Sequence, residues 1–308
     1  MTYKNILVVL NNHGSNHPAL DKSALIARIE KKVRITLFMP VFDFTLEIAS
    51  LASATERKSM LEKVISSKKE ELKSEVNAFM YDPDTVIEYK VTWNRSPETA
   101  IFSEIESNSY DLIIKNTAPA GVGAGVLFTP DDWQLLRSSD LPVMLVKEHE
   151  WPVNGNIILA LTFSQNPAQK RQNVRLYRHA QMLSKLTASQ IHLVNAVPQL
   201  DMGIATFDMP GFVPGMFAEA VHQSNKLLID EFVKQHPIPE DHIHILDGIP
   251  EDVICEQAKK LNSLAVIMGT VGRDGLSGAI LGNTAEQIVD NINCDLFVVR
   301  NRIYSKRH

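Results

Sequence analysis

The glycines of this 308-residue chain gather at one place where the backbone could bind an anion. Five of the 14 glycines lie between Gly269 and Gly282, directly after an apolar run at 265–268. Glycines at the end of a strand let the backbone approach a phosphate and present its N–H groups. Asn283 or Thr284 can cap the helix that follows, whose N-terminus offers further N–H donors. The spacing therefore favours binding of a phosphate or a similar anion.

Charged residues of the loop, and the catalytic motifs that the sequence lacks, indicate whether the loop binds a ligand or catalyses a reaction. Arg273 can add a charge-assisted contact to a bound anion, and Asp274 can hold Mg²⁺. The sequence contains neither a P-loop nor a G-x-S-x-G motif. Without a phosphate-binding lysine or an evident catalytic base, the loop predicts retention of a ligand rather than catalysis. An ordinary surface loop is the alternative interpretation.

Composition and charge exclude several classes of protein. Hydrophobic residues make up 44% of the chain and charged residues 22%, as in ordinary globular proteins. The formal charge of −5 gives no electrostatic reason to bind nucleic acid or an anionic membrane. No apolar run is long enough to span a membrane, and the first residues lack the pattern of a signal peptide. Because the only cysteines are Cys255 and Cys294, no disulfide framework is needed and we expect a cytoplasmic protein.

The elements that must position the glycine-rich loop occur twice along the chain. Four segments return in the same order at offsets of 151 to 154 residues: 4–10 at 155–161, 96–101 at 249–254, 112–114 at 266–268, and 141–146 at 294–299. Near-constant offsets indicate a duplicated unit. We therefore expect two domains, residues 1–150 and 151–308. The linker between them, 147–154, is short and polar, which favours packing of the two halves against each other.

Each half alternates short apolar runs with helical patterns. The runs are continuously apolar, which is typical of parallel strands buried on both faces. Strands are expected at 4–10, 33–39, 86–91, 111–115 and 142–146, and again at 156–161, 190–197, 242–246, 264–268 and 295–299. Helices are expected at 17–31, 54–79, 97–107 and 130–138, and again at 167–186, 216–235, 250–261 and 283–291. The alternation predicts an α/β protein with two doubly wound, five-stranded parallel sheets.

The spacing Gly269-x2-Gly272-x9-Gly282, with Asn283 in the Ser/Thr position, resembles the nucleotide-binding signature of the universal stress protein family. The tandem layout, with the signature in one half only, is similar to the E-type members of that family. This resemblance covers essentially the whole chain. It implies the strand order 3-2-1-4-5 in each half, in an adenine-nucleotide alpha hydrolase-like fold, and ATP or a related nucleotide as ligand.

The resemblance also implies roles for single residues of the loop. It places Gly269 and Gly272 against the ribose and the phosphates of a nucleotide. It places Gly282, Asn283 and Thr284 at the terminal phosphates.

Two positions that the resemblance places near the adenine base do not point clearly to adenine binding. Nucleotide-binding members carry an Asp at the end of the first strand, facing the adenine. This chain has Asn11 there in the first half and Thr162 in the second, and neither brings a charge. Val194, on the second strand, stands where the family packs an apolar residue near the base, although ordinary sheet core explains it equally well.

The first half lacks the glycine pattern. The positions that match the three signature glycines are Lys115, Ala118 and Phe128. A phenylalanine fills the space that a phosphate would need. We therefore expect nucleotide binding, if any, only in the second half.

Two further patterns leave their role open. The segment at 202–217 and its counterpart at 40–49 are rich in apolar residues, with Met, Phe, Gly and Pro together at 202–217. Three interpretations are open: they pack against the other half of the chain or another subunit, they form a lid over a hydrophobic ligand, or they are ordinary core. His242 and His244 are expected on one face of a strand, a spacing that zinc sites use. Because no Cys or carboxylate cluster accompanies them, core or surface histidines are favoured and no metal is expected.

The sequence thus predicts a cytoplasmic stress-response protein that binds a nucleotide or a similar anionic ligand in its second half without catalysis. The alternative is a protein-interaction module, or a carrier of a hydrophobic or amphipathic ligand, in which the glycine-rich loop is vestigial. Packing of the two halves against each other is expected, and a homodimer is compatible with the pattern.

Overall fold

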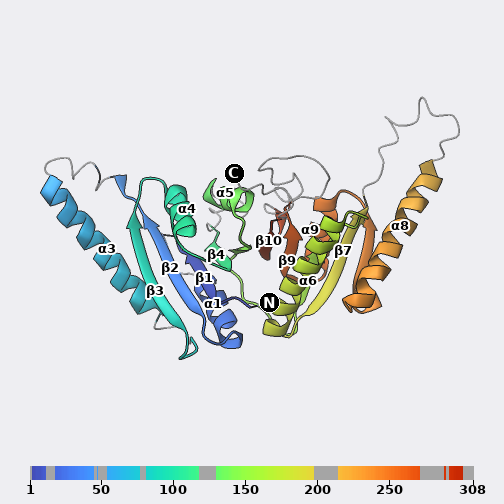
Figure 1. The fold of residues 1–308 in the computed structure, drawn as a ribbon, viewed down its shortest axis with the longest axis horizontal. Helices are drawn as coiled ribbons and strands as arrows, with labels where there is room; N and C mark the ends of the chain where they lie inside the picture. Colours follow the sequence, from blue (N-terminus) through green and yellow to red (C-terminus); the bar gives the residue numbers. More distant parts are fainter. Residues whose placement is uncertain are drawn as a thin grey trace, which may run out of the picture. The chain divides into compact units, whose positions relative to one another are not determined.

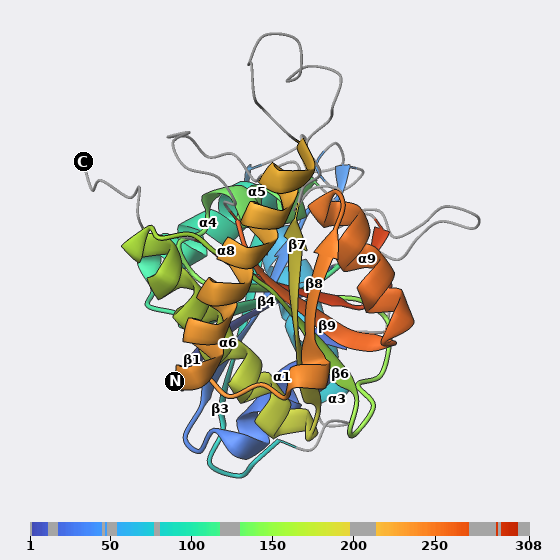
Figure 2. The ribbon, with the colours of Figure 1, turned by 90° about the vertical axis from the view of Figure 1, so that its right-hand side faces the viewer.

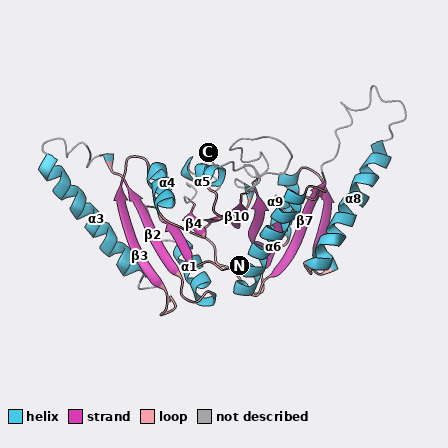
Figure 3. Cartoon of the chain, in the orientation of Figure 1, coloured by secondary structure: helices cyan, strands magenta, loops and turns pink. Residues whose placement is uncertain are grey.

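The computed structural model describes residues 2–11, 18–44, 47, 54–76, 81–117, 130–197, 214–270, 288 and 291–300 (Figures 1 and 3). The chain divides into two compact units, residues 2–149 and residues 150–308, called here the first and the second unit. Within the described residues, no helix has both the length and the apolar character needed to cross a membrane.

The first unit contains five parallel strands in the order β3-β2-β1-β4-β5 (Figure 1). The strands are β1 (Asn5–Val9), β2 (Arg34–Val41), β3 (Val86–Trp93), β4 (Leu112–Asn116) and β5 (Val143–Val146). Its helices are α1 (Pro18–Ile29), α3 (Ala54–Val76), α4 (Pro97–Ser107) and α5 (Pro130–Ser138). Every residue of β4 and β5 is buried, which explains why these runs are continuously apolar except at the end of β4.

The second unit repeats this arrangement, with the order β8-β7-β6-β9-β10. The strands are β6 (Asn156–Ala160), β7 (Gln190–Val197), β8 (Ile243–Asp247), β9 (Ser263–Gly269) and β10 (Asp295–Val299). The helices are α6 (Pro167–Thr187), α8 (Pro214–Gln235), the 3₁₀ turn η1 (Glu240–His242) and α9 (Pro250–Lys260). Figure 2 shows α6 and α8 on one face of the sheet and α9 on the other. The predicted fold, two doubly wound parallel sheets of order 3-2-1-4-5, is confirmed.

Helices α4 and α6 begin where the sequence provides a cap followed by proline. The Ser96 side chain accepts a hydrogen bond from the Thr99 N–H at 3.2 Å, and Asn166 accepts one from the Ala168 N–H at 2.9 Å. In each case a proline comes next, where its missing N–H costs no helical hydrogen bond. These caps fix where the chain turns from a strand end into a helix.

The linker between the units is tied to the second sheet. The indole N–H of Trp151 donates to Oδ2 of Asp295 at 2.7 Å, and Asp295 is the fully buried first residue of β10. A buried carboxylate needs such a partner, because leaving it unpaired in the interior is costly. Trp151 therefore belongs structurally to the second unit.

One expected element differs from the structure. His242 was expected on the same strand as His244, but it is the last residue of η1, and β8 starts at Ile243. Pro239 precedes this turn, and the N–H of His242 donates to its carbonyl at 2.9 Å. The fixed φ of proline favours this turn over an extended strand. Most of the helix expected at 283–291 lies outside the described residues.

Candidate ligand-binding site

The carboxyl ends of β6, β7 and β9 lie side by side in the second unit, and we call them the carboxyl edge. Strand β6 pairs with β7 on one side and β9 on the other. The chain leaves β6 toward β7 on one side and leaves β9 toward β10 on the other, so the connections diverge at this point. In open parallel sheets, ligands bind where the connections diverge in this way.

Thr162 follows β6 at this edge and is exposed. Its backbone carbonyl accepts a hydrogen bond from the Asn173 side chain of α6 at 3.0 Å. The side chain of the next residue, Phe163, packs edge to face on Phe232 of α8, with ring centroids 5.7 Å apart. The backbone at Thr162 is thus fixed by α6, while its surroundings are partly aromatic.

Val194 lies in the body of β7, opposite Ala160 of β6, and is 1% exposed. In this structure its side chain is part of the sheet core. The next residue, Asn195, escaped the sequence analysis. Its amide N–H donates to the Leu161 carbonyl at 2.9 Å, whereas its buried Oδ1 has no partner among the described residues. The only signal in the sequence is an amide inside an apolar run.

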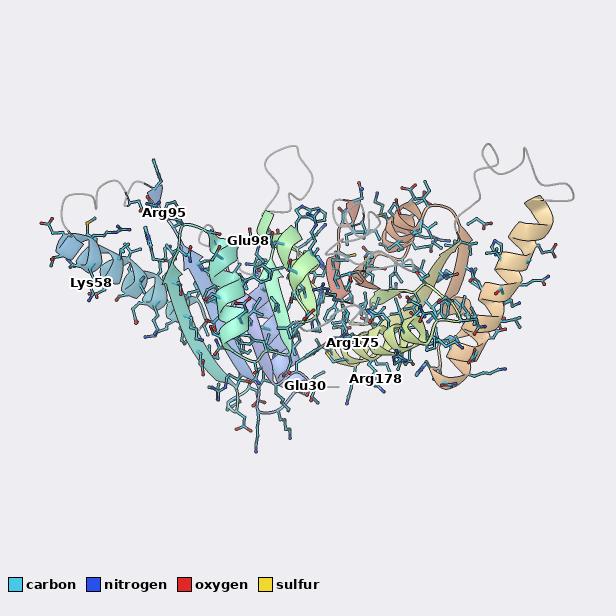
Figure 4. All side chains as sticks on the ribbon, turned by 45° about the horizontal axis from the view of Figure 1, so that its top comes forward. Glu30, Lys58, Arg95, Glu98, Arg175 and Arg178 are labelled. Atoms are coloured by element: carbon cyan, nitrogen blue, oxygen red, sulfur yellow. The ribbon has the colours of Figure 1, made fainter. Side chains whose placement is uncertain are left out.

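Gly269 ends β9 at the carboxyl edge, beside helix α6. A Cβ at this position would lie 3.3 Å from Nε2 of Gln172. That same Nε2 donates to the Val299 carbonyl at the end of β10, at 2.8 Å. One turn further along α6, Arg175 donates to the Arg300 carbonyl at 3.1 Å (Arg175 is labelled in Figure 4). Glycine therefore allows α6 to approach the end of β9 closely.

Thr270 follows Gly269 and is 5% exposed. Its buried Oγ1 has no hydrogen-bond partner among the described residues. A buried hydroxyl without a partner is costly, and a ligand, an ion or a water that bonds it would remove this cost. This orphan hydroxyl lies at the start of the glycine-rich loop.

Of the predicted site residues, the structure places Thr162 and Gly269 at the carboxyl edge, after or at the ends of neighbouring strands, and Val194 in the sheet core of β7. The other predicted site residues lie outside the described residues: Gly272, Arg273, Gly282, Asn283 and Thr284. So do Asp274, the segment 202–213, and the first-half positions Ala118 and Phe128.

The matching edge of the first unit is built differently. Lys115, the residue that matches Gly269, is 2% exposed, and its Nζ donates to Oδ1 of the fully buried Asp132 of α5 at 2.5 Å. The next residue, Asn116, accepts the Ala19 N–H of α1 at 2.7 Å. A charged pair thus fills the place where the second unit has glycine. The sequence showed that glycine was absent but gave no sign of Asp132 as the partner.

Part of the apolar connection after β2 is also described. Phe42 packs on Trp93 of β3 with ring centroids 5.8 Å apart, whereas Phe44 is 68% exposed. Glu47 pairs with Arg95 and Arg57, and the hydrogen bond from Arg95 lowers the pKa of Glu47 despite its burial. The connection after β2 is thus held partly by contacts with β3 of the same unit.

No group of three or more His, Cys, Asp or Glu side chains in the described ranges is arranged to hold a metal ion. Cys255 and Cys294 are both buried, and neither forms a disulfide. Burial in apolar surroundings lowers the reactivity of a thiol.

Comparisons with known proteins were made for the sequence and for the fold. The profile of the universal stress protein family matches residues 2–147 and 169–300. Universal stress protein E of Escherichia coli (strain K12) is 34% identical over 301 residues, covering 97% of this chain and 94% of that protein. The Universal stress protein E homolog of Haemophilus influenzae is 33% identical over 305 residues, covering 97% and 98%.

Solved structures show the same fold over nearly the whole length. A protein of unknown function from Pseudomonas aeruginosa PAO1 aligns with a TM-score of 0.73 at 24% identity, covering 97% of this chain and 93% of that one. A universal stress protein from Archaeoglobus fulgidus aligns with a TM-score of 0.62 at 17% identity, covering 96% and 98%. From the profile match in both units and the full-length relatives, we conclude that the chain belongs to the universal stress protein family.

Proposed function

We propose that the second unit binds a nucleotide, or a ligand with similar phosphate chemistry, and retains it without turnover as part of a stress response. The observation that carries the proposal is the orphan Oγ1 of Thr270, buried beside Gly269 at the carboxyl edge. A phosphate or ribose oxygen supplies the missing hydrogen bond to this hydroxyl. The membership in the universal stress protein family supports a stress-related role.

The surrounding residues suit this ligand. Oδ1 of Asn195, on the other side of β6, is a second buried atom with unused hydrogen-bonding capacity, and it can accept an N–H from a base. The loop from Gly272 to Thr284 continues directly from Thr270 and would supply backbone N–H groups and the Arg273 cation to the phosphates. Asp274 would be the residue to hold Mg²⁺, if a metal accompanies the nucleotide.

Only the second unit is proposed to bind the nucleotide. In the first unit, the Lys115 side chain and Asp132 occupy the end of β4 and neutralise each other. A phosphate entering there would have to displace a buried carboxylate from its ammonium partner, which costs several kcal/mol, roughly 3–5.

A second candidate is a carrier of a hydrophobic or amphipathic ligand. The observation in its favour is the aromatic packing beside Thr162, where Phe163, Phe232 and Tyr177 meet edge to face. A ligand with an anionic group near Thr270 and an apolar portion toward Phe163 would use both features. The segment 202–217 would then cover the apolar portion.

Mass spectrometry of the purified, denatured protein separates the two candidates. Release of a nucleotide supports the proposal, whereas release of a lipid-like mass supports the carrier. Absence of any retained mass, together with no heat on titration with ATP, would contradict both.

Thr270→Val tests the orphan hydroxyl directly. Valine keeps the shape of threonine but removes the hydroxyl, so ATP affinity should fall about tenfold while the free energy of unfolding rises by about 1 kcal/mol. The matched control is Thr187→Val, because Oγ1 of Thr187 is fully used, with the Leu183 carbonyl at 2.9 Å and Ser189 Oγ at 2.7 Å. This control should lose stability and leave ATP affinity unchanged. Unchanged affinity in Thr270→Val would contradict a role for the hydroxyl in binding.

The remaining expectations concern assembly and location. We infer that the two units pack as a pair, so limited proteolysis near 147–154 should not release two halves that separate on a sizing column. A homodimer is a further possibility for the same surfaces, and light scattering would detect it. Two buried cysteines that form no disulfide suit a reducing compartment, in line with the proposed cytoplasmic location.

A further inference from the structure

Three histidines lie together at the amino end of the second unit's sheet, opposite the carboxyl edge. His192 is near the start of β7, His244 near the start of β8, and His242 at the end of η1. The ring of His192 stacks on His242 with centroids 4.1 Å apart and lies nearly parallel to His244 with centroids 5.4 Å apart. His192 is 6% exposed, so it forms the buried centre of this histidine cluster.

A chain of hydrogen bonds fixes which ring nitrogens carry protons. Asn156, the first residue of β6, donates its amide to the Leu261 carbonyl at 2.7 Å, which leaves its Oδ1 as an acceptor. Nε2 of His192 lies 3.1 Å from this Oδ1 and must therefore donate. In a neutral imidazole the other nitrogen, Nδ1, is then an acceptor. Nε2 of His244, 3.1 Å from that Nδ1, donates to it.

This chain links three neighbouring strands through neutral rings. It runs from β8 through His244 to His192 on β7, and from there through Asn156 on β6 to the end of α9. Strand β8 is the edge strand of the unit and pairs with β7 alone. The His192–His244 bond is thus a side-chain tie between the edge strand and the rest of the sheet.

A second proton on His192 breaks this tie. It would sit on Nδ1 and point at the N–H of His244 across the same 3.1 Å. Among the charged groups around the cluster, Lys260 of α9 opposes a proton on His244, whereas Asp241 of η1, which is 83% exposed, weakly favours one on His192 and on His244. Burial, followed by His242 and His244, lowers the pKa of His192 to about 4. Burial, followed by Lys260, also lowers the pKa of His244.

We propose that the Asn156–His192–His244 chain is an acid-responsive latch of the second unit. While its rings are neutral it holds β8 against β7, and protonation of His192 releases the edge strand. The first unit has a different tie at its edge strand, an ion pair at 2.7 Å between Arg34 of β2 and Glu88 of β3. The first unit's edge is therefore free of this imidazole switch.

Backbone hydrogen exchange on the full chain at pH 7.5 and pH 5.0 tests the latch. After correction for the intrinsic pH dependence, protection of the β8 amides should fall about 30-fold, which is the linkage expected for a pKa of about 4 when closed and 6.5 when open. The amides of β3 serve as the internal control and should keep their protection. An equal change in β3 and β8 would overturn the proposal.

Two variants keep the test decisive if one of them perturbs folding. His192→Gln retains a donor for Asn156 and an acceptor for His244 but takes no second proton. The part of the loss of β8 protection that is due to His192 should therefore disappear. Asn156→Asp offers a carboxylate to the protonated ring and should also reduce the drop. A wild-type drop in both variants would contradict the latch, as would a nitrogen-15 spectrum showing His192 protonated at Nδ1 at pH 7.5.

Discussion

The ends of β4 and β9 occupy the same place in the two units but differ in chemistry. Strand β9 ends in Gly269, followed by the orphan hydroxyl of Thr270. Strand β4 has Lys115 at the matching position, in a buried ion pair with Asp132. The sheets around them share order and parallel pairing. The fold thus needs only buried apolar strands here, whereas the proposed ligand binding would depend on one or two single positions.

The ends of β4 and β9 also differ in how their buried polar groups find hydrogen-bond partners. In the first unit, the ammonium and carboxylate satisfy each other within the chain. In the second unit, the hydroxyl of Thr270 and the Oδ1 of Asn195 are left for something outside the described residues to satisfy. A strand end whose buried polar groups bond each other is stable without a ligand. A strand end with unsatisfied polar groups is stabilised when a ligand binds there.

Removing one member of the ion pair should have the largest effect. Asp132→Leu leaves the Lys115 ammonium buried without this carboxylate, so the first unit should lose about 3–5 kcal/mol of stability in urea unfolding. The double variant Lys115→Met, Asp132→Leu should be close to wild type, because a buried pair can be replaced by packed apolar groups. A single variant within about 1 kcal/mol of wild type would show that the pair is not the feature that closes this end.

Blocking the open end should abolish ligand binding without harming the fold. Gly282→Val places a branched side chain where the terminal phosphates are expected, and loss of two charged hydrogen bonds should weaken ATP binding at least about 100-fold in calorimetry. The far-ultraviolet circular dichroism should stay unchanged. In the first unit, Phe128→Gly should not create a site, because Lys115 and Ala118 remain. Full ATP affinity in Gly282→Val would refute the assignment of the loop.

Acid should weaken the second unit more than the first. Burial, followed by the charge of Arg175, lowers the pKa of His179 to about 3. The unfolded chain binds a proton at that histidine near pH 6.5 while the native chain does not, so stability is complete above pH 6.5 and falls as the pH drops toward 3. His179 alone should cost about 2 kcal/mol between pH 7.5 and pH 5.0.

Urea unfolding at the two pH values, followed by the fluorescence of Trp151 in a Trp93→Phe, Trp133→Phe background, measures this loss in the second unit. His179→Gln should reduce the loss by about the same 2 kcal/mol. Seven of the ten histidines lie in the second unit, so the first unit should change less. Equal losses of unfolding free energy in the two units would contradict the prediction that acid weakens the second unit more.

The smallest effect expected is one that the two units share. Lys32 and Ala188 both adopt a left-handed backbone, with φ of 59° and 52°, two residues before β2 and β7. Residues with a Cβ pay a steric cost there that glycine avoids. Lys32→Gly and Ala188→Gly should each stabilise their unit by about 0.5–1 kcal/mol in chemical denaturation. Stabilisation in one unit only would show that the two turns are not equivalent.

The strand pattern could be predicted from the sequence because it depends on local composition. The expected runs at 190–197 and 295–299 coincide with β7 and β10, and continuous apolar runs indicated burial on both faces. Pairings between distant side chains could not be predicted. His192 meets His244 only because β7 and β8 pair with Val194 opposite His244, and this register is set by tertiary packing.

The candidate site likewise contains residues that could be predicted from the sequence and residues that could not. Glycine spacing pointed to Gly269, because backbone access leaves a trace in residue type. The unsatisfied oxygens of Asn195 and Thr270 left none, since a buried amide or hydroxyl inside an apolar run is usually satisfied by its neighbours. His242 was misplaced on a strand because the turn after Pro239 competes with an extended conformation over only a few residues.

The hydrogen bond from Trp151 to Asp295 decides how the second unit can be produced alone. An expression fragment that begins after Trp151 would remove a hydrogen-bond donor from a fully buried carboxylate, so the fragment should begin at or before Glu150. Such a fragment carries Trp151 as its single tryptophan, since the other two, Trp93 and Trp133, lie in the first unit. Its emission would then report on the surroundings of Asp295 at the amino end of β10, so unfolding of the isolated second unit could be followed optically without a label.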